Sequence, residues 1–221
     1  MTKPASEHLL ALAKAGLNAV PVVGGSIASL IGDYIPTATQ RNVEKTLETL
    51  RAEVEALGNR VDVEAVNREE FAEIFKSAYL VAVRTHNEAK LRAAVKLVAN
   101  VLLRDGDLAK LSYTEVDHYA RCLDLLSSGG IQALAHAVRI ADHESPGRLV
   151  TNSVAITFER LQAEIPQVAP SLLMGLVGEL DALNLVHRAG VPTIRTPDYG
   201  NYSIEVTPLG GRFAKHLLAV A

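Results

Sequence analysis

The chain has 221 residues, 48% hydrophobic and 5% aromatic, with 22 Lys and Arg against 25 Asp and Glu. This length and apolar share exclude a wholly disordered chain, and the net charge of −3 excludes the broad basic field of a typical nucleic-acid-binding protein. The single cysteine, Cys122, excludes an internal disulfide framework and a thiolate metal cluster, and is typical of a reducing cytoplasm.

Residues 1–36 are predicted to form an apolar helical hairpin. Pro21 and the Gly24-Gly25 pair interrupt its helical periodicity, and Pro36 ends it. The 18 residues between Lys14 and Asp33 carry no charge. Because a spanning helix needs about 20 apolar residues and this run contains proline and glycine, we expect no stable membrane span.

Two interpretations of the hairpin remain open. Burial in a helical bundle is favoured, because apolar hairpins are usually part of a core. Alternatively, the hairpin contacts a membrane or a partner, and its small residues suit close helix packing in either setting. The contact residues in the second interpretation are Leu17, Val20, Val22, Val23, Gly24, Gly25, Ile27, Leu30 and Ile31.

Residues 37–144 are predicted to form a helical bundle. A helix over about 38–57 has an apolar seam with heptad spacing, and is short enough to be either a bundle helix or a dimer contact. Asn67 with Glu70, and Ser112 with Glu115, are predicted capping boxes. Further helices are predicted over about 88–104, 112–126 and 131–143, the last separated from its predecessor by Gly129-Gly130.

The segment 143–147 is the predicted boundary before a C-terminal domain, residues 145–221. Helices are predicted around 154–164 and 171–184, and a last helix after Thr207-Pro208. Short β-type runs are predicted at 185–188, 191–196 and 202–206.

This order resembles a winged helix-turn-helix. Leu180–Val186 resembles the end of a recognition helix running into the first wing strand, and Tyr202–Gly210 resembles the second wing strand and the helix after it. The resemblance covers about the last 75 residues of the 221 and implies a fold rather than a function. The predicted fold class is therefore mainly α, an N-terminal helical bundle followed by a C-terminal winged helix-turn-helix with a small β-hairpin.

A DNA-reading winged helix needs basic or amide side chains on its recognition helix. The predicted helix over 171–184 contains no Lys or Arg, and its charged residues are Glu179 and Asp181. Docking of a protein partner, or dimerisation, is therefore preferred to DNA binding. If DNA is bound, the candidate contacts are Arg188, Arg195, Arg212 and Lys215.

A second resemblance concerns the N-terminal half. Val20–Ala28, followed by a long charged helix, and Arg84–Arg92, followed by an apolar helix, are similar to a group of uncharacterised bacterial helical proteins. Distant relatives of that group are associated with abortive phage infection. This resemblance implies a defence or membrane-stress setting and assigns no catalytic residue.

No enzyme is predicted, and no catalytic residue, cofactor or metal site is assigned. His118 and Cys122 are four residues apart on a predicted helix, and His136 and His143 are seven apart on another, but neither pair completes a catalytic or metal-binding pattern. We expect a cytoplasmic interaction protein that contacts a protein partner or membrane through the hairpin, with peripheral membrane association or self-association as options. The alternative is a winged-helix DNA-binding transcriptional regulator.

Overall fold

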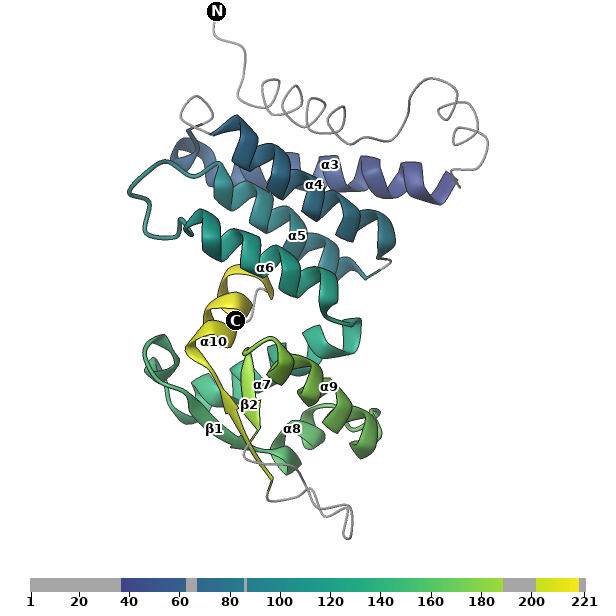
Figure 1. Cartoon of the computed structure of the whole chain (residues 1–221), viewed down its shortest axis with the longest axis vertical. Coiled ribbons are helices and arrows are strands. Elements are labelled where there is room, and N and C mark those ends of the chain that lie inside the picture. Colours follow the sequence, from purple (N-terminus) through teal and green to yellow (C-terminus); the bar gives the residue numbers. More distant parts are fainter. Residues whose placement is uncertain (1–36, 63–66, 86, 189–201, 219–221) are drawn as a thin grey trace, which may run out of the picture. The chain divides into compact units, whose positions relative to one another are not determined.

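The computed structural model describes residues 37–62, 67–85, 87–188 and 202–218 (Figure 1). These residues are mainly helical and contain a small three-stranded antiparallel sheet, which confirms the predicted fold class at that level. The chain divides into two compact units, Met1–Asp124 and Leu125–Ala221. The hairpin predicted over residues 1–36 and the strand predicted over 191–196 lie outside the described residues.

The first unit is a group of helices that bury their apolar faces on one another (Figure 1). Its helices are α3 (Thr37–Leu57), α4 (Arg68–Arg84), α5 (Glu88–Val101) and α6 (Tyr113–Leu125), with the 3₁₀ turn η1 (Gly58–Arg60) after α3. Helices α3, α4 and α5 contact one another in pairs. Fully buried side chains include Phe71, Ile74, Leu97, Leu102, Tyr119 and Leu123.

Side-chain caps fix where two of these helices begin, as the sequence predicted. The Asn67 side chain accepts hydrogen bonds from the amides of Glu69 and Glu70 at 3.0 and 3.4 Å. Before α6, the Ser112 amide donates to the Glu115 carboxylate at 3.0 Å and the Glu115 amide donates to Ser112 Oγ at 3.3 Å. These bonds satisfy amides that have no partner within the first helical turn.

The turn between α5 and α6 is braced from two sides. Asn100, nearly buried, donates to the carbonyl of Ala109 at 2.7 Å and accepts from the amide of Leu111 at 2.8 Å. Arg60 donates two bonds to the Asp107 carboxylate, at 2.7 and 2.8 Å. These bonds and the amide of Ala109 lower the pKa of Asp107 to about 2. The turn is thus held in one conformation by side chains from α5 and η1.

The second unit surrounds the sheet with helices. Its elements are α7 (Ser128–Glu144), η2 (Arg148–Val150), β1 (Val154–Thr157), α8 (Phe158–Glu164), α9 (Pro170–Ala182), β2 (Val186–Arg188), β3 (Ser203–Val206), α10 (Pro208–Phe213) and η3 (Ala214–Leu218). The strand order is β1-β3-β2, and both pairs are antiparallel. Ile156 pairs with Ile204, and Val186 pairs with Val206; all four side chains are buried.

The helix predicted over 154–164 is wrong in its first four residues, which form β1. Val154 and Ile156 alternate with exposed residues, and this period of two lets β1 pair with β3 while burying one face. Thr157 then caps α8 by accepting from the amide of Arg160 at 3.4 Å. A run of four residues is too short to show a period of two, so its apolar residues merge with the pattern of the helix that follows it.

Helix α7 begins earlier than predicted and belongs to the second unit. Gly129 and Gly130 lie in its first turn rather than before it, because Ser127 is the N-cap and accepts from the Gly130 amide at 3.0 Å. Helix α7 contacts α8, α9 and β1. The contacts therefore divide the chain after Asp124, and the boundary predicted at 143–147 falls inside the second unit.

Replacing Asn100 by Ala is expected to destabilise the first unit by about 2–3 kcal/mol, because it leaves two buried backbone groups without partners. Urea unfolding of the full chain, together with hydrogen exchange of the Leu111 amide, measures this loss. Asn152→Ala, on the exposed surface of the second unit, is the control and is expected to change stability by less than about 0.5 kcal/mol. An Asn100→Ala chain as stable as the control would contradict the bracing role.

Candidate interaction surface

Helix α9 is anchored by one narrow apolar face. Pro170 stands in its first turn, where its missing N–H has no cost, and Leu173, Val177 and Leu180 are fully buried. These positions follow the i, i+4, i+7 spacing of one helical face. The opposite side of the helix is thereby turned away from the core of the unit.

That opposite side carries no charge. We call it the outer face of α9, and Leu172 stands at its edge with 58% of its surface exposed. Gly175 and Ala182 are exposed, and Met174 and Gly178 are half-buried. The outer face consists of Ser171, Met174, Gly175, Gly178 and Ala182.

Two carboxylates flank the outer face, one on each side, and the first is used within the fold. Glu179 Oε2 accepts from the amide and the hydroxyl of Ser127, at 3.2 and 2.8 Å. This places a negative charge at the N-terminus of α7, where the helix dipole favours it. A Cβ on Gly130 would lie 2.3 Å from the same oxygen, so a side chain there would displace the Glu179 carboxylate from this position.

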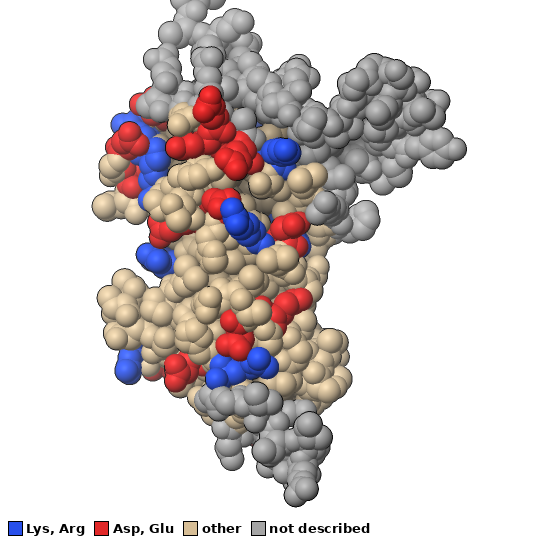
Figure 2. All heavy atoms as spheres, in the orientation of Figure 1, with Lys and Arg blue, Asp and Glu red and all other residues tan. Residues whose placement is uncertain are grey.

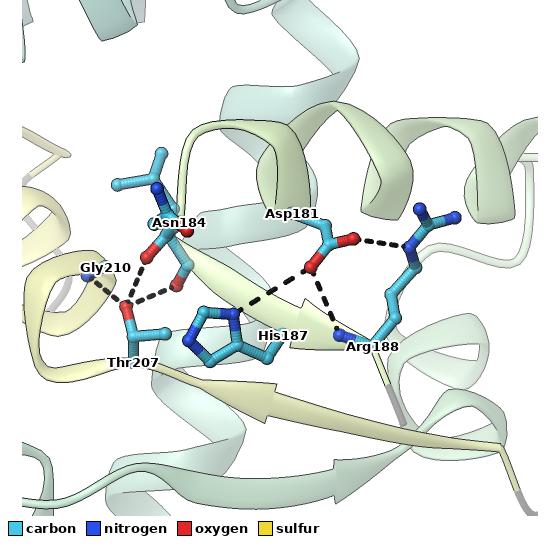
Figure 3. Close-up of polar contacts among 7 residues, drawn as sticks. Asp181, Asn184, His187, Arg188, Thr207 and Gly210 are labelled. Carbon is cyan, nitrogen blue, oxygen red and sulfur yellow. Dashed lines mark hydrogen bonds and ion pairs between the residues drawn. The ribbon is translucent and has the colours of Figure 1, made fainter. Parts of the chain in front are cut away.

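The second carboxylate, that of Asp181, holds the end of β2 (Figure 3). One of its oxygens accepts from Nε of Arg188 at 2.9 Å, and the other accepts from the Arg188 amide at 3.3 Å. Nδ1 of His187 lies 3.9 Å from Asp181 Oδ1. Asp181 therefore neutralises the arginine nearest to α9 and fixes where its guanidinium lies.

A hydroxyl network joins the end of α9 to α10 (Figure 3). Thr207 Oγ1 lies within donating distance of two carbonyls, 2.8 Å from that of Asn184 and 3.0 Å from that of Leu185. It accepts from the Gly210 amide at 3.0 Å. Asn184 has φ +56°, a left-handed conformation that asparagine tolerates and that ends the helix. A Cβ on Gly210 would lie 2.0 Å from the Leu185 carbonyl oxygen, so only glycine allows this approach.

The glycines of the outer face differ from Gly130 and Gly210. A Cβ on Gly175 would meet nothing within 4 Å. A Cβ on Gly178 would meet only the guanidinium of Arg188, with Nη1 at 3.4 Å. Each glycine inside a helix costs about 0.5–1 kcal/mol relative to alanine. The packing of the described residues does not require Gly175, which leaves α9 with bare backbone on its outer side.

The residues proposed for DNA contact are not gathered on one element. Arg188 ends β2 and is paired with Asp181, Arg212 lies on α10, Lys215 lies in η3, and Arg195 lies outside the described residues. On the face drawn in Figure 2, blue and red side chains are interspersed, and no broad basic field is seen among the described residues. Sequence reasoning selected these residues by charge and had no signal for the Asp181 contact.

The cysteine and histidine pairs have structural partners. Cys122 Sγ lies 3.5 Å from His118 Nε2, so the two residues share a face as their spacing suggested. Burial raises the pKa of the Cys122 thiol to about 11, which keeps it protonated at neutral pH. His136 lies 3.5 Å from Glu164, beside Arg139, rather than next to His143. Within the described ranges, no three or more His, Cys, Asp or Glu side chains are arranged to hold a metal ion.

A cavity of about 490 Å³ opens in the first unit beside the braced turn. Of its carboxylates, Asp107 is bound by Arg60, and Asp105 is 2.8 Å from the Lys110 ammonium. Tyr113, also in the lining, donates to Glu73, which raises the pKa of its hydroxyl to about 12. Asp105, Asp107 and Tyr113 are thus each bonded within the fold, and two of their partners, Arg60 and Glu73, lie outside the lining.

Comparison with protein-family models, with curated proteins and with solved structures found no match to this chain. In the part of the chain that the structure describes, no helix combines the length and apolar character needed to cross a membrane.

Gly175→Ala is expected to stabilise the second unit by about 0.5–1 kcal/mol, because the side chain enters open space and favours the helix. Gly210→Ala is the matched comparison and is expected to destabilise it by about 3 kcal/mol or more, because the Leu185 carbonyl occupies the space. Thermal and urea unfolding of both variants measures the difference. A destabilising Gly175→Ala substitution would show that the fold itself needs the bare backbone.

Proposed function

We propose that the chain is a non-enzymatic interaction protein whose second unit is a winged helix that docks a protein partner on the outer face of α9. The carrying observation is that none of the five residues of this face is charged, and that the one guanidinium lying against it, that of Arg188, is paired with Asp181. Both carboxylates beside the face are bonded within the fold. Uncharged surface with exposed apolar side chains is typical of the centre of protein interfaces.

The order of elements supports the winged-helix part of the proposal. Helices α8 and α9 are followed by strands β2 and β3 and then by α10, and β3 lies between β1 and β2. In a winged helix, α9 takes the place of the recognition helix, and the segment between β2 and β3 takes the place of the wing. Protein docking then uses the surface that DNA-binding members use for bases.

The absence of catalysis is part of the same proposal. The Cys122 thiol is fully buried and held protonated, which argues against a thiolate nucleophile. Nε2 of His118 lies 3.5 Å from this protonated thiol, and the contact joins two residues one turn apart on the same helix.

The hairpin of residues 1–36 is proposed as a second contact region, for a partner or a membrane, and its support is the sequence alone. Its uncharged run of 18 residues is unusual beside the polar surface of a helical bundle. The resemblance of the N-terminal half to abortive-infection-type proteins supports a phage-defence setting.

DNA-binding regulation is the second candidate, favoured by the sheet order and by Arg212 and Lys215 on exposed positions of α10 and η3. Opposing it, α9 offers no Lys or Arg to a phosphate backbone, and Arg188 is paired with Asp181.

Site-specific photo-crosslinking tests the docking surface. Benzoylphenylalanine is placed at Leu172 or, as control, at Val150, which is 67% exposed in the same unit. In cells of the source organism, a discrete protein adduct is expected at 172 and not at 150, and Gly175→Glu is expected to abolish it. Equal labelling at both positions, or an adduct insensitive to Gly175→Glu, would overturn the proposal.

Titration with random duplex DNA at low and high salt separates the two candidates. The full chain is expected to bind DNA weakly or not at all, and without a steep salt dependence. Helix α9 has no Lys or Arg to neutralise phosphates, so its binding would release no counterions from the DNA. Tight binding that falls steeply with salt and weakens in Arg212→Ala would favour the regulator instead. Lys76→Ala, on the first unit, is the charge-matched control.

Liposome flotation tests the hairpin. If residues 1–36 bind a membrane, the full chain is expected to float, and Val22→Asp with Val23→Asp is expected to stay in the soluble fraction. If the unmodified chain also stays in the soluble fraction, the proposed membrane contact is wrong, and contact of residues 1–36 with a protein partner remains as the proposal.

A further inference from the structure

Arg188 is presented on the outer face of α9 rather than merely neutralised there. Its guanidinium lies against Gly178, at van der Waals distance: Nη1 is 3.4 Å and Cζ 3.8 Å from the place that a Cβ would take. Asp181 binds only Nε, at 2.9 Å. In Figure 3 the two terminal nitrogens point away from Asp181.

The edge formed by these two nitrogens is available for a further contact. Among the described residues, Nη1 and Nη2 of Arg188 have no hydrogen-bond partner, and the side chain is 31% exposed. A guanidinium donates from two edges, and the Nη1/Nη2 edge matches the two oxygens of a carboxylate. Because Asp181 and Gly178 already fix the group, binding there loses little side-chain entropy.

The surroundings determine which oxyanion fits. The outer face beside Arg188 is apolar and uncharged, and Tyr202 lies close enough for Arg188 and Asp181 to affect its pKa, which burial raises. Tyrosine and arginine are enriched at the energetic centres of protein interfaces. A phosphate backbone would bring several negative charges to a face with one partly neutralised cation, whereas a protein segment can bring one carboxylate among apolar residues.

We propose that the outer face of α9 binds a protein segment carrying one Asp or Glu side chain among small and apolar residues, and that this carboxylate pairs with the Nη1/Nη2 edge of Arg188. This inference rests on the proposed docking function and names the chemistry of the partner. Asp181 is a positioning residue: it orients the guanidinium and does not touch the partner.

The test uses a displayed library of random 12-residue peptides selected on the full chain, with affinities of the selected peptides measured by fluorescence anisotropy. Selected peptides are expected to share an acidic residue flanked by apolar ones. Arg188→Gln is expected to weaken them about thirtyfold, as loss of an interface hot spot does. Arg148→Gln, an exposed arginine on η2 of the same unit, is the matched control and is expected to leave affinity unchanged.

A double-mutant cycle then isolates the pair. Replacing the acidic residue of the peptide by its amide is expected to weaken binding to the unmodified chain about thirtyfold and to have little effect on Arg188→Gln. Arg188→Lys keeps the charge without the planar fork and is expected to lose most of the affinity. It also serves as the second variant should Arg188→Gln melt at a lower temperature than the unmodified chain.

The outcomes separate this inference from the proposed function. If Gly175→Glu abolishes peptide binding but the cycle shows no coupling between Arg188 and the carboxylate, the inference is wrong and docking on α9 stands. If no selected peptide depends on Gly175, both are wrong. If random duplex DNA displaces the peptides from the unmodified chain but binds Arg188→Gln more weakly, the group that Arg188 binds is a phosphate. This result also overturns the inference.

Discussion

The close approach of Gly210 to the carbonyl of Leu185 is the constraint on which the second unit depends. It brings the start of α10 against the residue that links α9 to β2, with Thr207 bonded to both sides of the junction. The left-handed Asn184 turns the chain at this point. This junction holds Leu185, the residue before β2, next to Thr207, the residue after β3, and β2 pairs with β3 from there. The C-terminal end of α9 is fixed at the same point.

The two acidic residues of α9 both attach this helix to other elements of the second unit. Glu179 ties the helix to the beginning of α7, and Asp181 ties it to the end of β2. Both carboxylates therefore face sideways, toward other elements of the unit. What remains on the outer side is backbone, small side chains, Met174 and the oriented guanidinium of Arg188, which is the arrangement on which the proposed docking rests.

Much of the fold was accessible from local sequence patterns. The caps at Asn67 and Ser112 and the beginning of α10 at Thr207-Pro208 each depend on residues within a few positions, and each was predicted. Strand β1 was missed because the strand with which it pairs, β3, is some 50 residues away in the chain: Val154 pairs with Val206. Long-range pairing of this kind leaves no short-range signal in a four-residue run.

Of the features of the candidate surface, the sequence predicted only the absence of Lys and Arg. The lack of Lys and Arg in the helix was visible in the sequence, but the pairing of Asp181 with Arg188 and the open space over Gly175 depend on three-dimensional arrangement. Charge alone selected Arg188 as a phosphate contact, because a sequence shows which residues are charged and not which are already paired. Its seven-residue separation from Asp181 spans a helix end, a turn and a strand, and so follows no simple periodicity.

In the proposed docking surface, Gly175 sets folding against binding at a single position. Every other residue except proline would make α9 a better helix, and its side chain would cover the backbone that the proposed partner approaches. A protein kept for its fold alone would lose this glycine readily, whereas one kept for docking would retain it at the expense of stability. The second unit is in this sense less stable than its own architecture permits, and a substitution that stabilises it at position 175 would cover part of the proposed docking surface.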